Sequence, residues 1–323
     1  MKRIPIIWIE IGRKIPRHLK RNILFHSSSF PELQQFLITD QRVSKRIRRI
    51  CNVIDVKSLS NLANEDYLDR ELNRSTMQRQ FWINTTRRFF VIQAFMDREQ
   101  LEEVIHLESD CILIEPNSLD AVFNEINWSL AYPMQADGVG CASILLLRGV
   151  SGIKDFNSLV QANWGEENQD DMKLLGKFAT NPQVRILPTT PGAEIMFDPQ
   201  IFGRYLLGTD ARNNRFPFSR RGIVDDRLGA SNPENYSYRW SDNSHSLIID
   251  FCGSFSRLVN IHIHSKRVPK NWRQLDKMLG VDVKRIGSKK WKRGKFDSQV
   301  FTERLVSWLS RKVLKRSIDY RLR

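Results

Sequence analysis

The sequence predicts an α/β protein, and three stretches of it support this prediction. Residues 5–12 (PIIWIEIG) form an apolar, β-rich run, a helical pattern begins after Pro16, and residues 34–40 (QQFLITD) form a second buried run. Residues 80–97 keep apolar side chains at the spacing of a buried helix, and the apolar run 104–107 (VIHL) follows closely. Strands that alternate with helices are typical of a sheet covered by helices.

Further runs extend this pattern. Three more stretches predict strands, residues 128–133, 142–148 and 258–264, and residues 111–114 form another apolar run. Residues 166–178 predict a helix with a carboxylate-rich first turn. Residues 194–240 are rich in Gly, Pro, Asn and Arg, so we expect loops that cover a site.

Composition describes an ordinary globular chain. Its 323 residues are 41% hydrophobic and 27% charged, enough to bury a core and unlike a disordered chain. The sequence contains no run of about 18 uncharged apolar residues, so we expect no transmembrane helix. Glu10 interrupts the apolar N-terminal stretch, so we expect no secretory signal. Four separate cysteines without a CxxC pair exclude a cysteine zinc site and favour a cytoplasmic location: Cys51, Cys111, Cys141 and Cys252.

The basic charge is concentrated at the two ends of the chain. Of a net charge of +15, residues 1–50 carry +9 and residues 284–323 carry +11, which leaves −5 for the middle. Basic ends on an acidic middle favour an electrostatic tether over a nucleic-acid-binding protein. With no repeat or linker before residue 284, we expect one catalytic domain over 1–283 and a basic amphipathic extension over 284–323.

This extension has the composition of a membrane-surface segment. Residues 284–295 are basic around one tryptophan, and residues 297–316 predict an amphipathic helix. Each basic residue near an anionic leaflet contributes ~1 kcal/mol, and basic amphipathic helices lie in membrane interfaces. We therefore expect contact with an anionic membrane surface, with a terminal helix packed on the protein's own core as the alternative.

The strongest chemical signal is an acid-x-acid motif. Glu108 and Asp110 flank Ser109 directly after the buried run 104–107. A buried strand does not normally end on two carboxylates unless a cation satisfies them, and hard oxygen ligands suit Mg²⁺ or Mn²⁺. The alternative is an exposed turn.

Two histidines late in the chain could complete such a site. His262 and His264 are two residues apart, so they would share one face of a strand. An imidazole beside carboxylates favours Mn²⁺, and Lys266 could meet a diphosphate as a point charge. We favour His264 over His262; the alternative is that both are ordinary core or surface histidines.

Charged residues on two predicted helices are the remaining candidates. Arg87 and Arg88 precede the acid motif, where an arginine could reach a diphosphate or a carboxylate bidentately, or could lie on a solvated face. Asp170 and Asp171 lie at a helix start, which the helix dipole alone explains. The functional alternative is a catalytic base, Asp171 ahead of Asp170.

These residues carry a family resemblance. The stretch FFVIQAFM…LEEVIHLESDCILI resembles the region around the DXD-like metal motif of GT-A glycosyltransferases. Residues 194–210 and 260–266 are similar to bacterial enzymes that build surface polysaccharides. The resemblance implies a GT-A-like (Rossmann-type) mixed sheet flanked by helices, and nucleotide-sugar donors, UDP-sugars above all, bound with Mn²⁺ or Mg²⁺.

The resemblance also implies roles for individual residues. A late histidine, His264 or His262, would complete the metal shell formed by Asp110 and Glu108. Because the first acid is glutamate instead of the usual aspartate, Asp110 is the firmer ligand. The residues expected at the nucleotide sugar are Asp40, Arg88, Glu108, Ser109 and Lys266.

The expected activity is metal-dependent sugar transfer to a saccharide or lipid-linked acceptor in surface polysaccharide synthesis. A chain with an acidic middle and basic ends suits an enzyme at the inner face of the cell membrane. We expect no nucleic acid as a partner. One alternative is a metal-dependent nucleic-acid-binding protein or nuclease, supported by the pI of about 9.9. The other is a non-catalytic scaffold that uses only the C-terminal segment.

Overall fold

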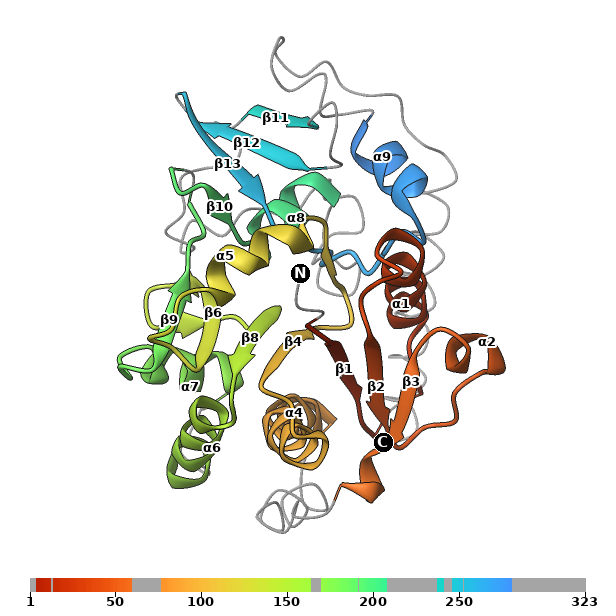
Figure 1. The fold of residues 1–323 in the computed structure, drawn as a ribbon, viewed down its shortest axis with the longest axis vertical. Coiled ribbons are helices and arrows are strands. Elements are labelled where there is room, and N and C mark those ends of the chain that lie inside the picture. Colours follow the sequence, from red (N-terminus) through yellow and green to blue (C-terminus); the bar gives the residue numbers. More distant parts are fainter. Residues whose placement is uncertain are drawn as a thin grey trace, which may run out of the picture.

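A mixed eight-stranded sheet forms the centre of the molecule (Figure 1). The computed structural model describes residues 4–12, 14–59, 77–163, 170–190, 192–207, 237–240, 246–251 and 253–280. The strands of the central sheet are β1 (Ile6–Glu10), β2 (Gln35–Thr39), β3 (Asn52–Asp55), β4 (Glu103–Leu107), β6 (Leu130–Ala136), β7 (Val139–Gly140), β8 (Ile144–Arg148) and β9 (Val184–Leu187).

The strand order is β3-β2-β1-β4-β8-β6-β7, with β9 beside β6. The four strands β1 to β4 run parallel, whereas β8 is antiparallel to β4 and β6 is antiparallel to β8. The prediction of a mixed sheet is thus confirmed. The carboxyl ends of β1, β2 and β4 meet at one edge, where open α/β sheets place their ligands.

Helices cover both faces of this sheet, with α4 (Met77–Glu99) on one face and α1 (Arg17–Ser29) on the other. The other helices of the described residues are α2 (Lys45–Arg48), α5 (Leu119–Phe123), α6 (Ser151–Asn163), α7 (Asp171–Phe178), α8 (Ile201–Leu207) and α9 (Trp272–Gly280), with short 3-10 turns η1 (Val56–Ser58) and η3 (Pro116–Ser118). None of the described helices combines the length and the apolarity that crossing a lipid bilayer requires.

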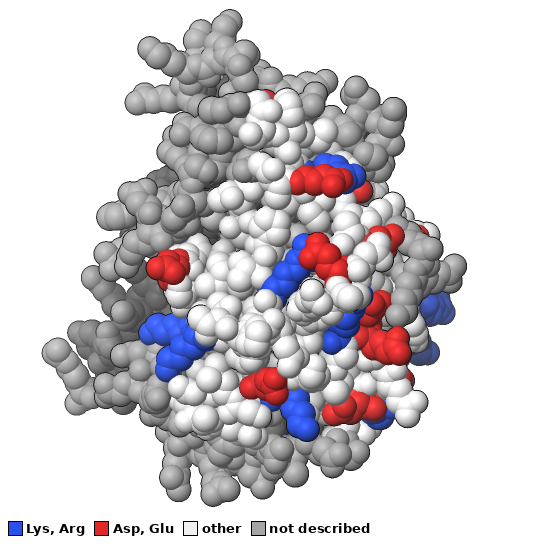
Figure 2. All heavy atoms as spheres, turned by 60° about the vertical axis from the view of Figure 1, so that its left-hand side comes forward, with Lys and Arg blue, Asp and Glu red and all other residues white. Residues whose placement is uncertain are grey.

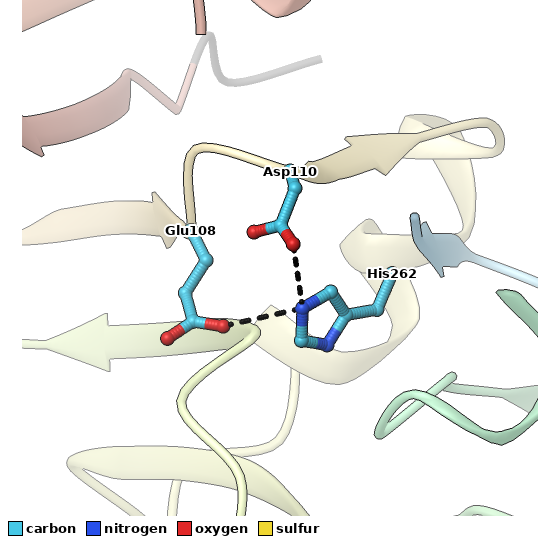
Figure 3. A group of neighbouring side chains, drawn as sticks. All are labelled: Glu108, Asp110 and His262. Carbon is cyan, nitrogen blue, oxygen red and sulfur yellow. Dashed lines mark hydrogen bonds and ion pairs between the residues drawn. The ribbon is translucent and has the colours of Figure 1, made fainter. Parts of the chain in front are cut away.

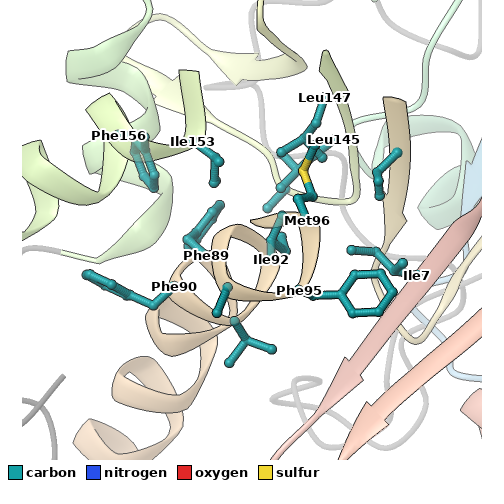
Figure 4. Close-up of a cluster of buried hydrophobic side chains, with 14 of the residues drawn as sticks. Ile7, Phe89, Phe90, Ile92, Phe95, Met96, Leu145, Leu147, Ile153 and Phe156 are labelled. Carbon is teal, nitrogen blue, oxygen red and sulfur yellow. The ribbon is translucent and has the colours of Figure 1, made fainter. Parts of the chain in front are cut away.

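The strands bury side chains on both faces, which explains their continuous apolar runs. On β1, Ile7 packs against the α4 side of the sheet, whereas Ile6 and Trp8 pack against the α1 side. Figure 4 shows the α4 side, where Phe89 and the other buried side chains of α4 meet Ile7, strand β8 and helix α6.

Two smaller sheets bring the later part of the chain to the central one. A four-stranded sheet is formed by β10 (Ile195–Met196), β11 (Ser237–Trp240), β12 (Leu247–Phe251) and β13 (Ser254–Leu258). The strand β14 (Asn260–His262) pairs antiparallel with β5 (Cys111–Leu113), so that His262 lies opposite Cys111. This pairing places a residue from late in the sequence beside the acid motif.

The structure corrects two of the expected elements. The predicted strand 258–264 is interrupted at Val259 and ends at His262. The stretch 194–240, predicted as loops, contains α8. Its Gly203 reads as a loop signal, yet an added Cβ there would lie only 1.9 Å from the His262 carbonyl oxygen, so the glycine allows close packing.

Part of the expected architecture lies outside the described residues. The extension 284–323, with its predicted helix 297–316, is one such part, and residues 208–236 are another. The proposed division into two domains therefore stays a prediction.

Candidate metal centre

The acid motif forms the turn between β4 and β5. The N–H of Cys111 donates to the Glu108 carbonyl at 2.9 Å, which closes the turn, and the N–H of Glu108 donates to the Ser143 carbonyl at 3.0 Å. Asp110 is 2% exposed. On the far side, the N–H of Ile263 donates to the Asp110 carbonyl at 2.7 Å, which fixes the end of β14 against the motif.

Three potential ligands converge at this turn (Figure 3). The Nε2 atom of His262 lies 3.2 Å from Asp110 Oδ2 and 3.5 Å from Glu108 Oε2. One ligand atom from each of these residues lies within 4.8 Å of the other two. Two carboxylate oxygens and one imidazole nitrogen are a donor set that fits Mn²⁺ or Mg²⁺.

Two cations balance the carboxylates. Lys266 Nζ donates to Asp110 Oδ2, and the Lys266 side chain is 31% exposed. Arg88 is 9% exposed and bridges two acids: its Nη1 lies 2.6 Å from Glu108 Oε1, and its Nη2 donates to Asp171 Oδ2. Arg88 thereby joins α4, the acid motif and α7.

The pKa values follow from burial and from these contacts. Burial alone would raise the pKa of Asp110, but His262 and Lys266 outweigh it and hold that pKa well below its usual value. Burial would lower the pKa of His262, but Asp110 and Glu108 raise it well above its usual value. For Asp171 burial dominates over Arg88, and the pKa is raised.

Helix α1 holds the backbone of the motif from the other side. The side-chain amide of Asn22 donates to the carbonyls of Ser109 at 3.2 Å and Cys111 at 2.8 Å. His18 bonds the Ser109 hydroxyl at 3.0 Å. His26 Nε2 accepts from the N–H of Leu113 at 3.1 Å. These three residues lie four apart on α1, so they form one polar stripe facing residues 109–113.

Asp198, which was not among the predicted site residues, is a buried carboxylate that positions His262. Its Oδ2 accepts from the N–H groups of His262 at 3.0 Å and Gly203 at 2.7 Å, and its Oδ1 accepts from two further N–H groups at the start of α8. Asp198 lies three residues before α8, and an aspartate close to a helix start can accept from the free N–H groups there. The sequence shows this local pattern but not its connection to His262.

The two predicted metal-ligand histidines do not share a face. The strand ends at His262, and the N–H of His264 donates back to the His262 carbonyl at 3.0 Å. The chain turns there, and His262 alone of the two joins the group with Glu108 and Asp110. The geometry therefore favours His262 over His264 as the ligand, and the metal-binding role of either stays a prediction.

The other predicted site residues have identifiable places. Asp170 is the N-cap of α7 and accepts from the N–H of Lys173 at 2.9 Å, whereas Asp171 is 1% exposed and faces Arg88. Asp40 follows β2 at the same sheet edge, and both its oxygens accept from the N–H of Gly12 at 3.1 Å. The roles assigned to these residues stay predictions.

Comparison of the whole structure with solved structures finds glycosyltransferases. PaToxG glycosyltransferase is similar with a TM-score of 0.38 and 13% identity, covering 55% of this chain and 67% of that one. Mouse xyloside xylosyltransferase 1 has a TM-score of 0.39 and 10% identity, with coverages of 57% and 85%. An active-site mutant of LgtC has a TM-score of 0.38 and 13% identity, with coverages of 94% and 96%.

No family model matches this chain, and no curated protein sequence matches it. At these identities and TM-scores the likeness does not carry over what those proteins bind or catalyse, so a function for this chain depends on its own side chains.

Proposed function

We propose that this protein is a metal-dependent glycosyltransferase that moves a sugar from a nucleotide-diphosphate sugar, a UDP-sugar in the first instance, to a saccharide or lipid-linked acceptor. The observation that carries the proposal is the group formed by Glu108, Asp110 and His262 at the carboxyl edge of the sheet. A divalent cation held there would neutralise the diphosphate as it leaves the sugar. Acceptors in surface polysaccharide synthesis at the inner membrane face are part of the same proposal.

The neighbouring cations suit this chemistry. Lys266 is bonded to Asp110 and partly exposed, so its ammonium group can turn from the carboxylate to a diphosphate when a metal takes its place. Arg88 is buried and held by two carboxylates, so it fixes the position of Glu108.

Asp171 is the candidate base. One of its oxygens accepts from Arg88, and the other, Oδ1, is buried without a hydrogen-bond partner in the described part of the chain. Burial raises the pKa of Asp171, which moves it towards the range in which a carboxylate takes a proton from an acceptor hydroxyl. Asp170 is the weaker candidate because its side chain caps α7.

The test is thermal unfolding with Mn²⁺ and a panel of nucleoside diphosphates. A ligand at 100 times its dissociation constant stabilises a protein by ~2.7 kcal/mol, which is an easily measured shift. We expect a shift that needs both the metal and one nucleotide and that disappears in Asp110→Asn. Asp155→Asn is the control because Asp155 is an exposed acid on α6.

A second assay measures release of the nucleoside diphosphate from a panel of sugar nucleotides. Metal-dependent release that is lost in Asp110→Asn and kept in Asp155→Asn would support the proposal. If Mn²⁺ stabilises the protein but no nucleotide adds to the shift, the donor-site proposal fails. Cleavage of nucleic acid by the metal-bound protein would then favour the nuclease alternative.

A further inference from the structure

The charges of the described residues separate into two regions of opposite sign. Residues 14–50, which include α1 and α2, contain nine Lys and Arg and two acids. Residues 102–163, from just before β4 to the end of α6, contain nine acids and two Lys and Arg, and two of these acids are Glu108 and Asp110 of the metal centre. The Lys and Arg residues are therefore concentrated on the side of the molecule that α1 and α2 form.

The basic side is built by three neighbouring helices. Aromatic rings pack α9 onto α1, with Trp272 centred 5.1 Å from Phe25 and 5.8 Å from Phe30. Ile47 of α2 belongs to the same hydrophobic cluster as Leu19 of α1. Figure 1 shows α2, α1 and α9 along the right-hand side of the molecule.

We define the basic face by two exposed residues from each of these helices: Arg17 and Arg21 of α1, Lys45 and Arg46 of α2, and Arg273 and Lys277 of α9. Within the described part of the chain, none of the six forms an ion pair with a carboxylate. Their charges are therefore available to an external anion.

The opposite side of the molecule is different. Figure 2 brings forward the left-hand side of Figure 1, and there Lys and Arg lie beside Asp and Glu. Among the described residues after α4, Arg185 forms an ion pair with Glu125 at 2.6 Å, and Arg257 forms one with Glu194 at 2.5 Å. On that side, charges of both signs lie close together.

We propose that the basic face binds an anionic lipid surface. A planar anionic partner fits a face spread over the outer sides of three helices, because the six cationic side chains can then meet the same surface. Sites for single-stranded nucleic acid combine basic residues with exposed aromatic rings. On this face Phe25, Phe30 and Trp272 instead pack against one another.

The composition of the chain after α9 also favours an anionic lipid surface as the partner. Residues 284–323 contain fourteen Lys and Arg and three acids, so the most basic segment of the sequence follows directly on one helix of the face. The side of α1 that faces inwards bonds the turn carrying Asp110. A membrane on the outer side would thus lie about one helix diameter, ~10 Å, beyond that turn. The proposal concerns binding alone and is independent of the metal centre.

The experiment is co-sedimentation of the full chain with phosphatidylcholine vesicles that contain phosphatidylglycerol at roughly a third of the lipid. Each basic residue at such a surface strengthens binding about fivefold, so the triple variant Arg21→Gln, Lys45→Gln, Arg46→Gln should bind about 100-fold more weakly. Binding should also weaken as salt is raised and should be lost on pure phosphatidylcholine.

The matched control removes three Lys residues elsewhere: Lys154→Gln, Lys173→Gln and Lys177→Gln, from α6 and α7. It loses the same net charge, so a similar loss of binding in both triple variants would overturn the proposal. Wild-type binding by the first triple variant would also overturn it and would assign binding to residues 284–323 alone. Tighter binding to an oligonucleotide than to the vesicles, lost in the first triple variant, would assign the face to nucleic acid.

Discussion

The turn and strand formed by residues 108–113 are held from two sides by different kinds of interaction. On one side, three polar side chains of α1 form hydrogen bonds, chiefly to the backbone. On the other side, Arg88, His262 and Lys266 form ion pairs with the carboxylates. The first side fixes where the acids lie, and the second balances their charge. On the second side, Lys266 is the partly exposed cation that a metal could replace at Asp110.

The largest expected effect is a loss of folding stability when Arg88, on the side held by ion pairs, is replaced. Removing one partner of a buried ion pair leaves an uncompensated charge and costs about 3–5 kcal/mol of stability. We expect Arg88→Met to lower the free energy of unfolding by this amount, because Glu108 and Asp171 both lose their cation. Urea unfolding measures it.

Arg98→Met is the control on the same helix. Arg98 pairs with Glu99, and both side chains are partly exposed, at 30% and 36%, so that pair is worth at most about 1 kcal/mol. Equal losses in the two variants would contradict the view that the Arg88 bridge holds the ionic side together.

The next largest effect is a dependence of folding stability on pH, which arises from His26 of α1. Burial lowers the pKa of His26 from 6.5 to about 4 in the folded protein. The unfolded chain therefore binds this proton first as the pH falls. The contribution to stability is full above pH 6.5 and is lost between 6.5 and 4, by about 3 kcal/mol in total. A protonated His26 could no longer accept from the Leu113 N–H.

Urea unfolding at a series of pH values measures this loss. His26→Gln should reduce the slope of stability against pH in that window by up to about 1.4 kcal/mol per pH unit. His106, whose pKa burial lowers to about 3, is present in both proteins and does not affect the difference. Identical slopes in the two proteins would show that His26 is not held neutral by the fold.

A third prediction separates positioning from stability. Asn22→Ala removes the donor for the carbonyls on both sides of Asp110, so we expect a loss of about 2 kcal/mol of stability and weaker Mn²⁺ binding. Asn157 is equally buried and bonds the Phe89 carbonyl and Gln93, away from the acid motif. Asn157→Ala should lose similar stability and bind Mn²⁺ as the wild type does. Titration calorimetry decides, and equal Mn²⁺ affinities in the two variants would deny Asn22 a positioning role.

The difference between local and long-range contacts explains how much of the fold and of the site could be predicted from the sequence. Local patterns predicted the central strands, the helix α4 and the acid motif, because apolar periodicity and the unusual end of a buried strand are both local signals. The choice between His262 and His264 was not local. It depends on the β5–β14 pairing, which places His262 opposite Cys111 and beside Asp110, 152 residues earlier in the chain.

Two further features were hidden for the same reason. The helix α8 includes Gly203, whose role is visible only from its contact with the His262 carbonyl. The polar residues of α1 read as part of an ordinary helix, because their partners are carbonyls and N–H groups of a segment far along the chain. Side chains that serve a distant backbone leave little trace in a single sequence.

The smallest expected effect is a change in Mn²⁺ affinity that distinguishes Lys266 from Arg88. Lys266 competes with a metal for Asp110 Oδ2, and its side chain is 31% exposed, so solvent weakens the pair that has to be broken. We expect Lys266→Gln to tighten Mn²⁺ binding about fivefold in the absence of nucleotide, while Lys270→Gln, an exposed lysine nearby, changes nothing. Calorimetric titration with Mn²⁺ measures this change. If Lys266→Gln also weakens binding of the nucleoside diphosphate to the Mn²⁺-loaded protein, Lys266 moves from carboxylate to phosphate. An unchanged Mn²⁺ affinity would mean that Lys266 remains on Asp110 beside the metal, as fixed a partner as Arg88.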